Sequence, residues 1–335
     1  MHMADALLSA QVGLTMWAVS GGSVAAGALR LKKDELSEKK LPLMAVSGAF
    51  VFAAQMINFT IPGTGSSGHI GGGILLSALL GGWPALLTIT AVLVIQCLVF
   101  ADGGLLALGC NIFNMGVIPC LIAYPLLFRP LLKGGITKKR LGIASVLSCV
   151  FGLQLGAFAV VLQTQLSGIT ALPFGTFLLL MQPIHLAIGL VEGFVTAAVL
   201  VFVYQMRPEL RTSAQERSGL QKDISIKKVL AVLAVLAVVT AGGFSLLASA
   251  YPDGLEWSIQ GVTGSTELEG QGDAVHAAAQ AAQDATAVMP DYETSAGKGT
   301  GAAGIIGAVA TFALAGACGW GISAAKKHNK HGGAR

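Results

Sequence analysis

The first two residues of the chain, Met1 and His2, could bind one metal ion through three nitrogen atoms. The terminal amine, the amide nitrogen of His2 and Nδ1 of its imidazole can close two adjacent chelate rings on one ion. A second imidazole would complete a plane of four nitrogens, and His69 is the candidate. Such a plane suits Ni(II) or Cu(II), with Co(II) next. The alternative is that His2 is simply the second residue of a frayed terminus.

His69 belongs to a glycine-rich loop at 62–73 that admits several interpretations. Its glycines match GxGxxG, but no βαβ unit surrounds them, so we interpret this dinucleotide pattern as accidental. GSSG at 65–68 matches the GxSG of rhomboid proteases, with Ser67 as nucleophile and His185 as a possible base. A third interpretation is a permissive backbone that aims His69 at the chelate. The remaining alternative is a helix-entry loop with an exposed histidine.

The composition predicts an all-α polytopic membrane protein. Of the 335 residues, 54% are hydrophobic and 11% are charged, whereas soluble domains carry about 25% charged residues. Mean hydropathy is +0.72. The five cysteines show no CxxC spacing, so neither a disulfide framework nor a thiolate metal site is expected. We expect this chain to contact membrane lipid and not to bind nucleic acid.

The positions of lysine and arginine predict the topology. All but Lys298 of the 21 fall at 30–40, 129–140, 207–228 and 326–335, which the positive-inside rule places in the cytoplasm. The N-terminus is then outside and the C-terminus cytoplasmic, in a cell membrane. About nine spans are expected, near 6–29, 41–60, 70–82, 84–101, 111–128, 141–165, 176–205, 228–250 and 302–325.

Two modules follow from this topology. Residues 1–206 form a seven-helix module, 207–227 a charged cytoplasmic linker, and 228–335 a two-helix module around an outer loop at 251–301. This loop carries eight carboxylates against Lys298 and is rich in Ala, Gly, Gln and Thr, so we expect much of it to be mobile. His276 in this loop, and His328 and His331 in the basic tail, are expected to be solvated.

Few ionisable residues lie in or beside the apolar segments, where they are costly and usually functional. They are Asp5, His69, Asp102, His185 and Glu192. His185 and Glu192 are two helical turns apart, so they share a face. The sequence has no HExxH and no P-loop motif, so a pumping activity would take its energy from a partner.

Five segments in order resemble CbiM/NikM, the substrate-capture components of nickel and cobalt energy-coupling-factor (ECF) transporters. They are MH at 1–2, SGH at 67–69, FADGG at 100–104, GCNIFNMG at 109–116, and PIHL at 183–186 with EG at 192–193. YPDGLEW at 251–257 resembles the PDGLE signature of the small CbiN/NikN partner. The resemblance covers most of 1–206 and implies that the partner is fused to it.

This resemblance implies a substrate-binding S-component bundle with its N-terminal segment inserted. It also implies metal ligation by Met1, His2 and His69, in agreement with the chelate. Asn111, Asn114, His185 and Glu192 match family positions. Together with Asp102 they are expected to orient ligands or to pack rather than to ligate.

The expected function is therefore capture and uptake of a divalent metal, with Ni²⁺ favoured over Co²⁺, and no enzymatic activity in this chain. A transmembrane coupling (T) component and separate ATP-binding subunits would be the partners. The alternatives are a rhomboid-like protease and a non-transporting metal sensor, which would need an output domain that the short cytoplasmic segments do not offer.

Overall fold

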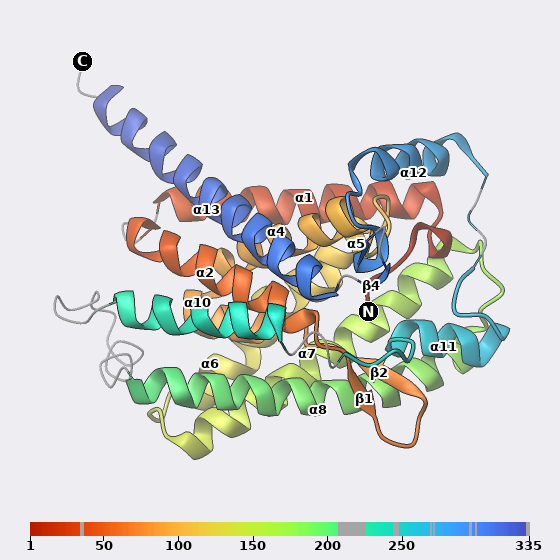
Figure 1. Cartoon of the computed structure of the whole chain (residues 1–335), viewed down its shortest axis with the longest axis horizontal. Coiled ribbons are helices and arrows are strands. Elements are labelled where there is room, and N and C mark those ends of the chain that lie inside the picture. The colour runs from red at the N-terminus through yellow and green to blue at the C-terminus, as the bar shows by residue number, and fades with distance from the viewer. Residues whose placement is uncertain are drawn as a thin grey trace.

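A computed structural model describes residues 1–33, 37–206, 226–243, 248–268, 270, 272–294, 297–298 and 300–332. The predicted linker lies outside the described residues up to position 225. Helices form most of the first module (Figure 1). They are η1 (Asp5–Leu7), α1 (Ala10–Lys33), α2 (Ser37–Gln55), α3 (Gly73–Leu80), α4 (Gly82–Phe100), α5 (Leu108–Ile112), α6 (Arg129–Leu132), α7 (Lys138–Ser167) and α8 (Phe174–Met206).

A π-helical segment, η2 (Phe113–Phe128), joins α5 to α6. It contains Pro119 and Pro125, which have no backbone N–H and cannot continue a regular hydrogen-bond ladder. This wide helix packs against α7 and α4.

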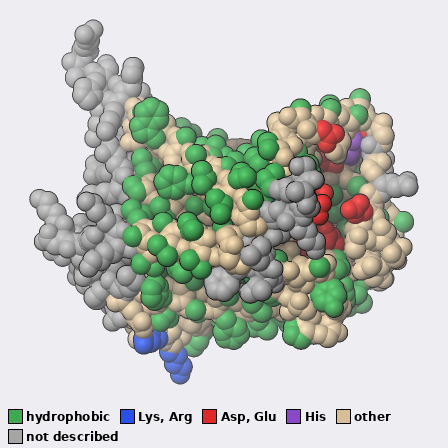
Figure 2. Space-filling view, viewed as in Figure 1, with side chains coloured by type: hydrophobic (Ala, Val, Ile, Leu, Met, Phe, Trp, Pro, Cys, Tyr) green, Lys and Arg blue, Asp and Glu red, His purple; other side chains and the backbone are tan. Residues whose placement is uncertain are grey.

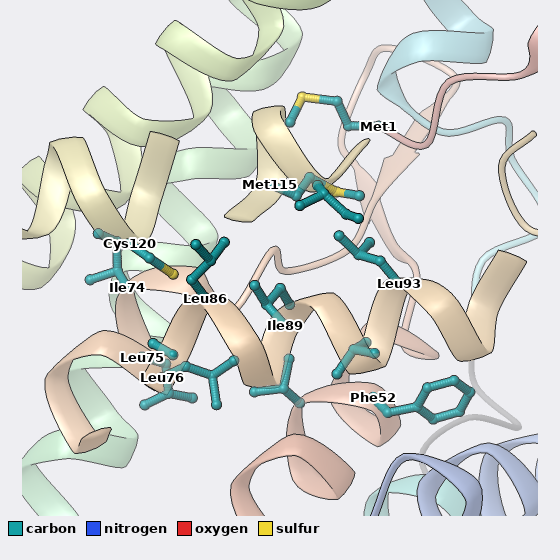
Figure 3. Close-up of a cluster of buried hydrophobic side chains, with 14 of the residues drawn as sticks. Met1, Phe52, Ile74, Leu75, Leu76, Leu86, Ile89, Leu93, Met115 and Cys120 are labelled. Atoms are coloured by element: carbon teal, nitrogen blue, oxygen red, sulfur yellow. The ribbon is translucent and has the colours of Figure 1, made fainter. Parts of the chain in front are cut away.

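Helix α4 is the centre of the core. It is apolar on all sides. In its most hydrophobic stretch 72% of the residues are buried, more than in any other described candidate span. Its neighbours include α1, α2, α3 and η2. Leu86, Ile89 and Leu93 of α4 pack with side chains from these neighbours, as Figure 3 shows for Ile74 and Met115.

The second module packs on the first through α10 (Ile226–Gly242) and α13 (Thr300–Gly332), which both contact α2 (Figure 1). Its outer loop contains α11 (Gly254–Thr263), α12 (Ala274–Thr286), η4 (Pro290–Tyr292) and the strand pair β3 (Glu293–Thr294) and β4 (Gly297–Lys298). The expectation of a largely mobile loop is therefore wrong for these segments. Asp253 and Asp273 cap the two helices, and alanine favours helix in α12.

The all-α polytopic class is confirmed. Six described helical segments are long and apolar enough to cross a membrane, and 40–55 and 230–242 are shorter apolar helices. The span predicted at 70–82 is wrong. The helix there, α3, has eight residues, about 12 Å at 1.5 Å per residue, against a hydrocarbon core of about 30 Å. Glycines at both of its ends limit its length.

Charge and apolar surface are separated on the molecule. Figure 2 shows apolar side chains over much of one face and acidic side chains gathered in a recess near one end. Leu179 and Phe194 of α8 are 74% and 65% exposed. Large apolar side chains this exposed are expected on helices that face lipid. The acidic recess is formed by the outer loop and the N-terminal segment.

Candidate metal-capture site

The N-terminal segment is buried between the helices instead of being frayed. Met1 is 8% exposed and Met3 is fully buried. Asn111 of α5 holds the main chain of Met3 from both sides, because its Oδ1 accepts from the Met3 N–H at 2.8 Å and its Nδ2 donates to the Met3 carbonyl at 3.2 Å. Asp5 accepts from the backbone N–H groups of Leu106 and Ala107. These contacts bring the terminal amine to the centre of the site.

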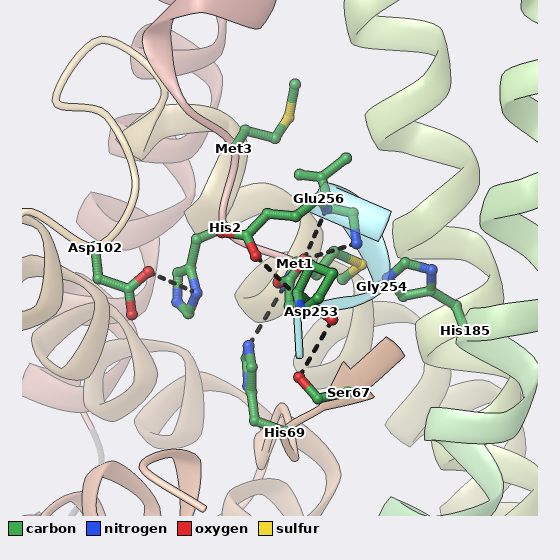
Figure 4. A network of polar contacts seen from close by, with 12 residues as sticks. Met1, His2, Met3, Ser67, His69, Asp102, His185, Asp253, Gly254 and Glu256 are labelled. Carbon is green, nitrogen blue, oxygen red and sulfur yellow. Dashed lines mark hydrogen bonds and ion pairs between the residues drawn. The ribbon is translucent and has the colours of Figure 1, made fainter. Parts of the chain in front are cut away.

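Three predicted ligand residues meet there (Figure 4). The amine of Met1 lies 3.4 Å from Nε2 of His69. The rings of His2 and His69 stack with their centroids 5.2 Å apart. Nδ1 of His69 lies 3.1 Å from the Ile70 carbonyl, so it carries the proton and leaves the Nε2 lone pair facing the amine. The donor atoms that the chelate needs are thus close together.

The glycine-rich loop forms a β-hairpin that leads into helix α3, and His69 lies between the two. Strands β1 (Phe59–Ile61) and β2 (Ser66–Gly68) pair antiparallel, with Phe59 opposite Gly68. Gly63 and Gly65 have φ of 78° and 72° in the turn, a conformation that glycine adopts at little cost.

Glu192 of α8 holds the other end of this loop. Its carboxylate accepts from the N–H groups of Gly71 and Gly72, at 2.8 and 2.9 Å, where α3 begins. This carboxylate therefore fixes the segment that follows His69.

The imidazole of His2 is held by an acid and an amide. Nδ1 lies 3.2 Å from Asp102, and Nε2 lies 3.2 Å from Oε1 of Gln96. Tyr292 of the outer loop donates a hydrogen bond to the same Asp102. Nδ1 of His2 therefore faces a carboxylate and not the amine, so forming the chelate requires the ring to turn. No pattern in the sequence pointed to Gln96 or Tyr292.

Asp253, in the PDGLE segment at 252–256, is the partner of the terminal amine. Its Oδ2 lies 2.5 Å from the Met1 nitrogen, and its Oδ1 accepts from the N–H groups of Leu255 and Glu256 at the start of α11. Asp253 thus caps α11, and the segment folds against the first module. Asp253 was not among the predicted site residues, although an Asp followed three residues later by Glu256 is a recognisable capping signal.

His185 lies directly beneath this turn. A Cβ on Gly254 would stand 3.1 Å from Cε1 of His185 and 3.0 Å from Cδ1 of Ile188, so only glycine lets the turn approach so closely. Figure 4 shows the imidazole pointing from α8 toward Asp253 and Met1. Nδ1 of His185 lies 2.8 Å from the Met181 carbonyl.

The geometry does not support the protease alternative. The hydroxyl of Ser67 donates to the Tyr251 carbonyl at 2.8 Å, and its N–H donates to the Pro252 carbonyl. The described residues include no hydrogen bond between Ser67 and His185. Ser67 instead ties the hairpin to the PDGLE segment.

Asn114 lies among buried polar side chains. It exchanges two hydrogen bonds with the amide of Gln163, and its Nδ2 also approaches the sulfur of Met3. It therefore supports the N-terminal segment from α7 and η2.

Burial and charge set the protonation of the site. Burial, with the adjacent amine, lowers the pKa of His69 to about 3. Burial also lowers the pKa of His2, although Asp102 opposes this. Burial alone would raise the pKa of Asp253, but the amine and His69 outweigh it and hold that pKa below its usual range. The unliganded site thus pairs an ammonium with a carboxylate and keeps the His69 imidazole neutral, ready to donate a lone pair.

An outer cavity of about 1240 Å³ opens onto these groups, and both His2 and His69 line it. Its lining is acidic and includes neither lysine nor arginine among the described residues. The carboxylates are Asp5, Asp102, Asp253, Glu256, Glu267, Asp284, Asp291 and Glu293.

His276 also lines this outer cavity, and the expectation that it is solvated is wrong. It is 5% exposed, with Nε2 at 2.9 Å from the Leu8 carbonyl and Nδ1 at 2.8 Å from Asp273. It joins α12 to the N-terminal segment. The two segments are far apart in the sequence, so the sequence alone does not indicate this contact. The side chains of His328 and His331 lie outside the described residues.

Within the described part of the chain, no three His, Cys, Asp or Glu side chains converge on one point as a metal cage. A site here would depend on main-chain nitrogens as well as imidazoles. A sequence profile described as "CbiM: Cobalt uptake substrate-specific transmembrane region" matches residues 2–210. The chain belongs to the CbiM family. A PDGLE domain matches residues 227–324, so the CbiM region is fused to a PDGLE domain, as the motifs predicted.

CbiM relatives and structures agree with this assignment. A protein of Haloquadratum walsbyi named "Putative metal transport protein" is 36% identical over 229 residues, 68% of this chain and 100% of the relative. The "Fused nickel transport protein NikMN" of Rhodobacter capsulatus is 27% identical over 257 residues, 72% of this chain and 74% of the relative. The crystal structure of a transition metal transporter has a TM-score of 0.56 and 29% identity, and covers 65% of this chain and 100% of that one.

Proposed function

We propose that this chain captures a divalent transition metal ion, nickel in preference to cobalt, for uptake by an ECF-type transporter. The observation that carries the proposal is the approach of the Met1 amine to within 3.4 Å of His69 Nε2, beside the His2 ring. The ligands are the Met1 amine, the amide nitrogen and Nδ1 of His2, and Nε2 of His69.

Capture requires a rearrangement of a few atoms. The ammonium leaves its ion pair with Asp253 and loses a proton, the His2 amide loses a proton, and Nδ1 of His2 turns from Asp102 toward the amine. A deprotonated amide is a strong-field donor, and four nitrogens in a plane favour low-spin Ni(II) over Co(II). Cu(II) would bind such a set more tightly, so selectivity against it depends on geometry and supply.

The acidic outer cavity supports the capture of a cation. A cleft lined by one sign of charge raises the local concentration of the opposite ion and its association rate. Since the carboxylates of this cavity lead to His2 and His69, a divalent ion would be drawn to the ligands.

Uptake needs partners. The sequence carries no P-loop, so ATP hydrolysis falls to separate ATP-binding subunits that act through a T component. The basic clusters support a cytoplasmic C-terminus, with the N-terminus and the acidic cavity on the outer side of a cell membrane. The nickel-transport name of the Rhodobacter capsulatus relative supports the choice of metal.

The test is competitive loading of the purified full chain with equal Ni(II) and Co(II), followed by elemental analysis. We expect about one metal per chain, mostly nickel. His2→Ala and His69→Ala should each abolish tight binding, while His328→Ala, from the basic tail, should not. A cobalt excess would contradict the preference, and metal retained by both ligand variants would contradict the site.

A further inference from the structure

A second, smaller cavity lies on the other side of the capture ligands. Its volume is about 30 Å³, enough for one water molecule or one metal ion with few remaining waters. His69 and Asp253 line both this inner cavity and the outer one, so they form the partition between the two, and Met1 lines the inner cavity. The inner cavity is also lined by His185, Cys149 and Met115.

His185 presents a free lone pair in the interior. Its side chain is buried, and Nε2 has no hydrogen-bond partner among the described residues. Because Nδ1 faces the Met181 carbonyl at 2.8 Å, Nδ1 carries the proton and Nε2 is the acceptor. A buried acceptor without a partner is destabilising, so an unpaired one requires an explanation.

The neighbours of His185 do not supply that partner. Both oxygens of Glu192 are taken by the N–H groups of Gly71 and Gly72, and the amide of Asn114 is taken by Gln163. The inner cavity is then left with the His185 nitrogen, the Asp253 carboxylate that pairs with the Met1 amine, and the side chains of Met115 and Cys149, whose thiol also donates to the Thr196 hydroxyl. These are electron-pair donors, and imidazole suits nickel well.

We propose that Nε2 of His185 is the ligand of a second, inner metal station, which receives the ion after it leaves the capture site. This inference rests on the proposed function and deepens it. His69 lines both cavities and Met1 lines the inner one, so an ion released from them on the inner side meets His185 next.

The inner station should bind the ion only weakly, as a site on a transport path must. One imidazole with weak sulfur donors binds loosely, and the described residues offer no cage of three ligating side chains there. A step on a transport path must bind well enough to be entered and weakly enough to be left. The PDGLE turn sets the position of the ring, because Gly254 packs against its Cε1.

The experiment titrates the purified full chain with Co(II), whose visible absorption reports its ligands. In the wild type we expect one tight equivalent and a second, weaker one. In His185→Ala the second equivalent should disappear while the first remains, and retention of the first shows that the chain is folded. His2→Ala should lose the first equivalent and keep the weaker one, and His328→Ala should keep both.

Uptake of radioactive nickel, in cells that supply the T component and ATPases, gives the second readout. We expect His185→Ala and His185→Gln each to reduce uptake at least about tenfold. Gln keeps the size and can hydrogen-bond to water, but it is a poor nickel ligand. Normal uptake by His185→Gln would mean that the inner cavity holds only water, and would overturn the proposal. So would a wild type with no second equivalent, or a His185→Ala chain that loses the first equivalent. Failure of His2→Ala to lose the first equivalent would instead contradict the proposed function.

Discussion

The terminal nitrogen of Met1 lies 2.5 Å from Oδ2 of Asp253, so the first residue is ion-paired with a residue 252 positions later. Both groups are largely buried, with 8% and 17% of their side chains exposed. The contact joins the first module to the second module at the site itself. In the unliganded state the PDGLE segment therefore holds the amine that metal binding needs.

Asp253→Asn removes the charge that holds the amine. A hydrogen bond to a charged group contributes roughly 1.5–3 kcal/mol, so hydrogen exchange at the Met3 amide should accelerate at least about tenfold. Exchange measured by mass spectrometry on the N-terminal peptide checks this. Glu267→Gln, which removes a carboxylate from the same outer cavity away from Met1, should leave the Met3 rate unchanged. Equal effects of both variants would mean that general charge, and not this ion pair, holds the terminus.

Asn111→Ala removes the two hydrogen bonds that fix the main chain of Met3. The chelate then loses its orientation while keeping every ligand. Loss of groups that orient ligands costs roughly 10- to 100-fold in metal affinity, and we expect nickel affinity, measured by calorimetry, to fall by that amount. Unchanged affinity would show that Met1 and His2 are positioned without the two hydrogen bonds from Asn111.

Gly254→Ala tests the close approach of the PDGLE turn to α8. The added methyl group meets Ile188, His185 and Ile184 at 3.0–3.2 Å. Overpacking of this kind costs roughly 1–3 kcal/mol, so α11 should be displaced and the thermal midpoint of the purified chain should drop. Gly175→Ala, in α8 and with nothing within 4 Å of its Cβ, is the control and should not lower the midpoint. A similar drop in both variants would contradict the packing account.

The sequence predicted the centre of this site and not its surroundings. Chelate chemistry brought Met1, His2 and His69 together without any contact information. Asp253 and Gln96 could not be predicted, because the pairing of the PDGLE segment with residue 1 depends on how the two modules pack.

Two errors in the fold have different causes, one local in the sequence and one not. The short α3 was read as a span because its glycine-rich flanks are apolar enough to extend the hydrophobic run. The buried His276 was read as solvated because its acceptor, the Leu8 carbonyl, is 268 positions away. Apolar runs indicate where helices are, but they do not show which helices stop early or which polar groups meet.

Proton release on metal binding should come from the amine and the amide. The pKa of His69 is lowered to about 3, so this ring stays neutral as pH falls below the ordinary histidine value of 6.5, and burial also lowers the pKa of His2. Binding should therefore release about two protons per metal, and weaken as pH falls. Calorimetry in buffers of different ionisation enthalpy, at pH 7.5 and 6, measures the count. A count that rises well above two at pH 6 would mean that the imidazoles are protonated in the unliganded chain.

The most direct test of the central claim is a one-residue extension before Met1. It converts the amine into an amide and removes one of the four nitrogens, while His2, His69 and the fold are unchanged. Elemental analysis of the purified chain should then find little or no nickel, and proteolytic removal of the extension should restore about one nickel per chain. Full nickel content in the extended chain would show that the amine is not a ligand and would contradict the account.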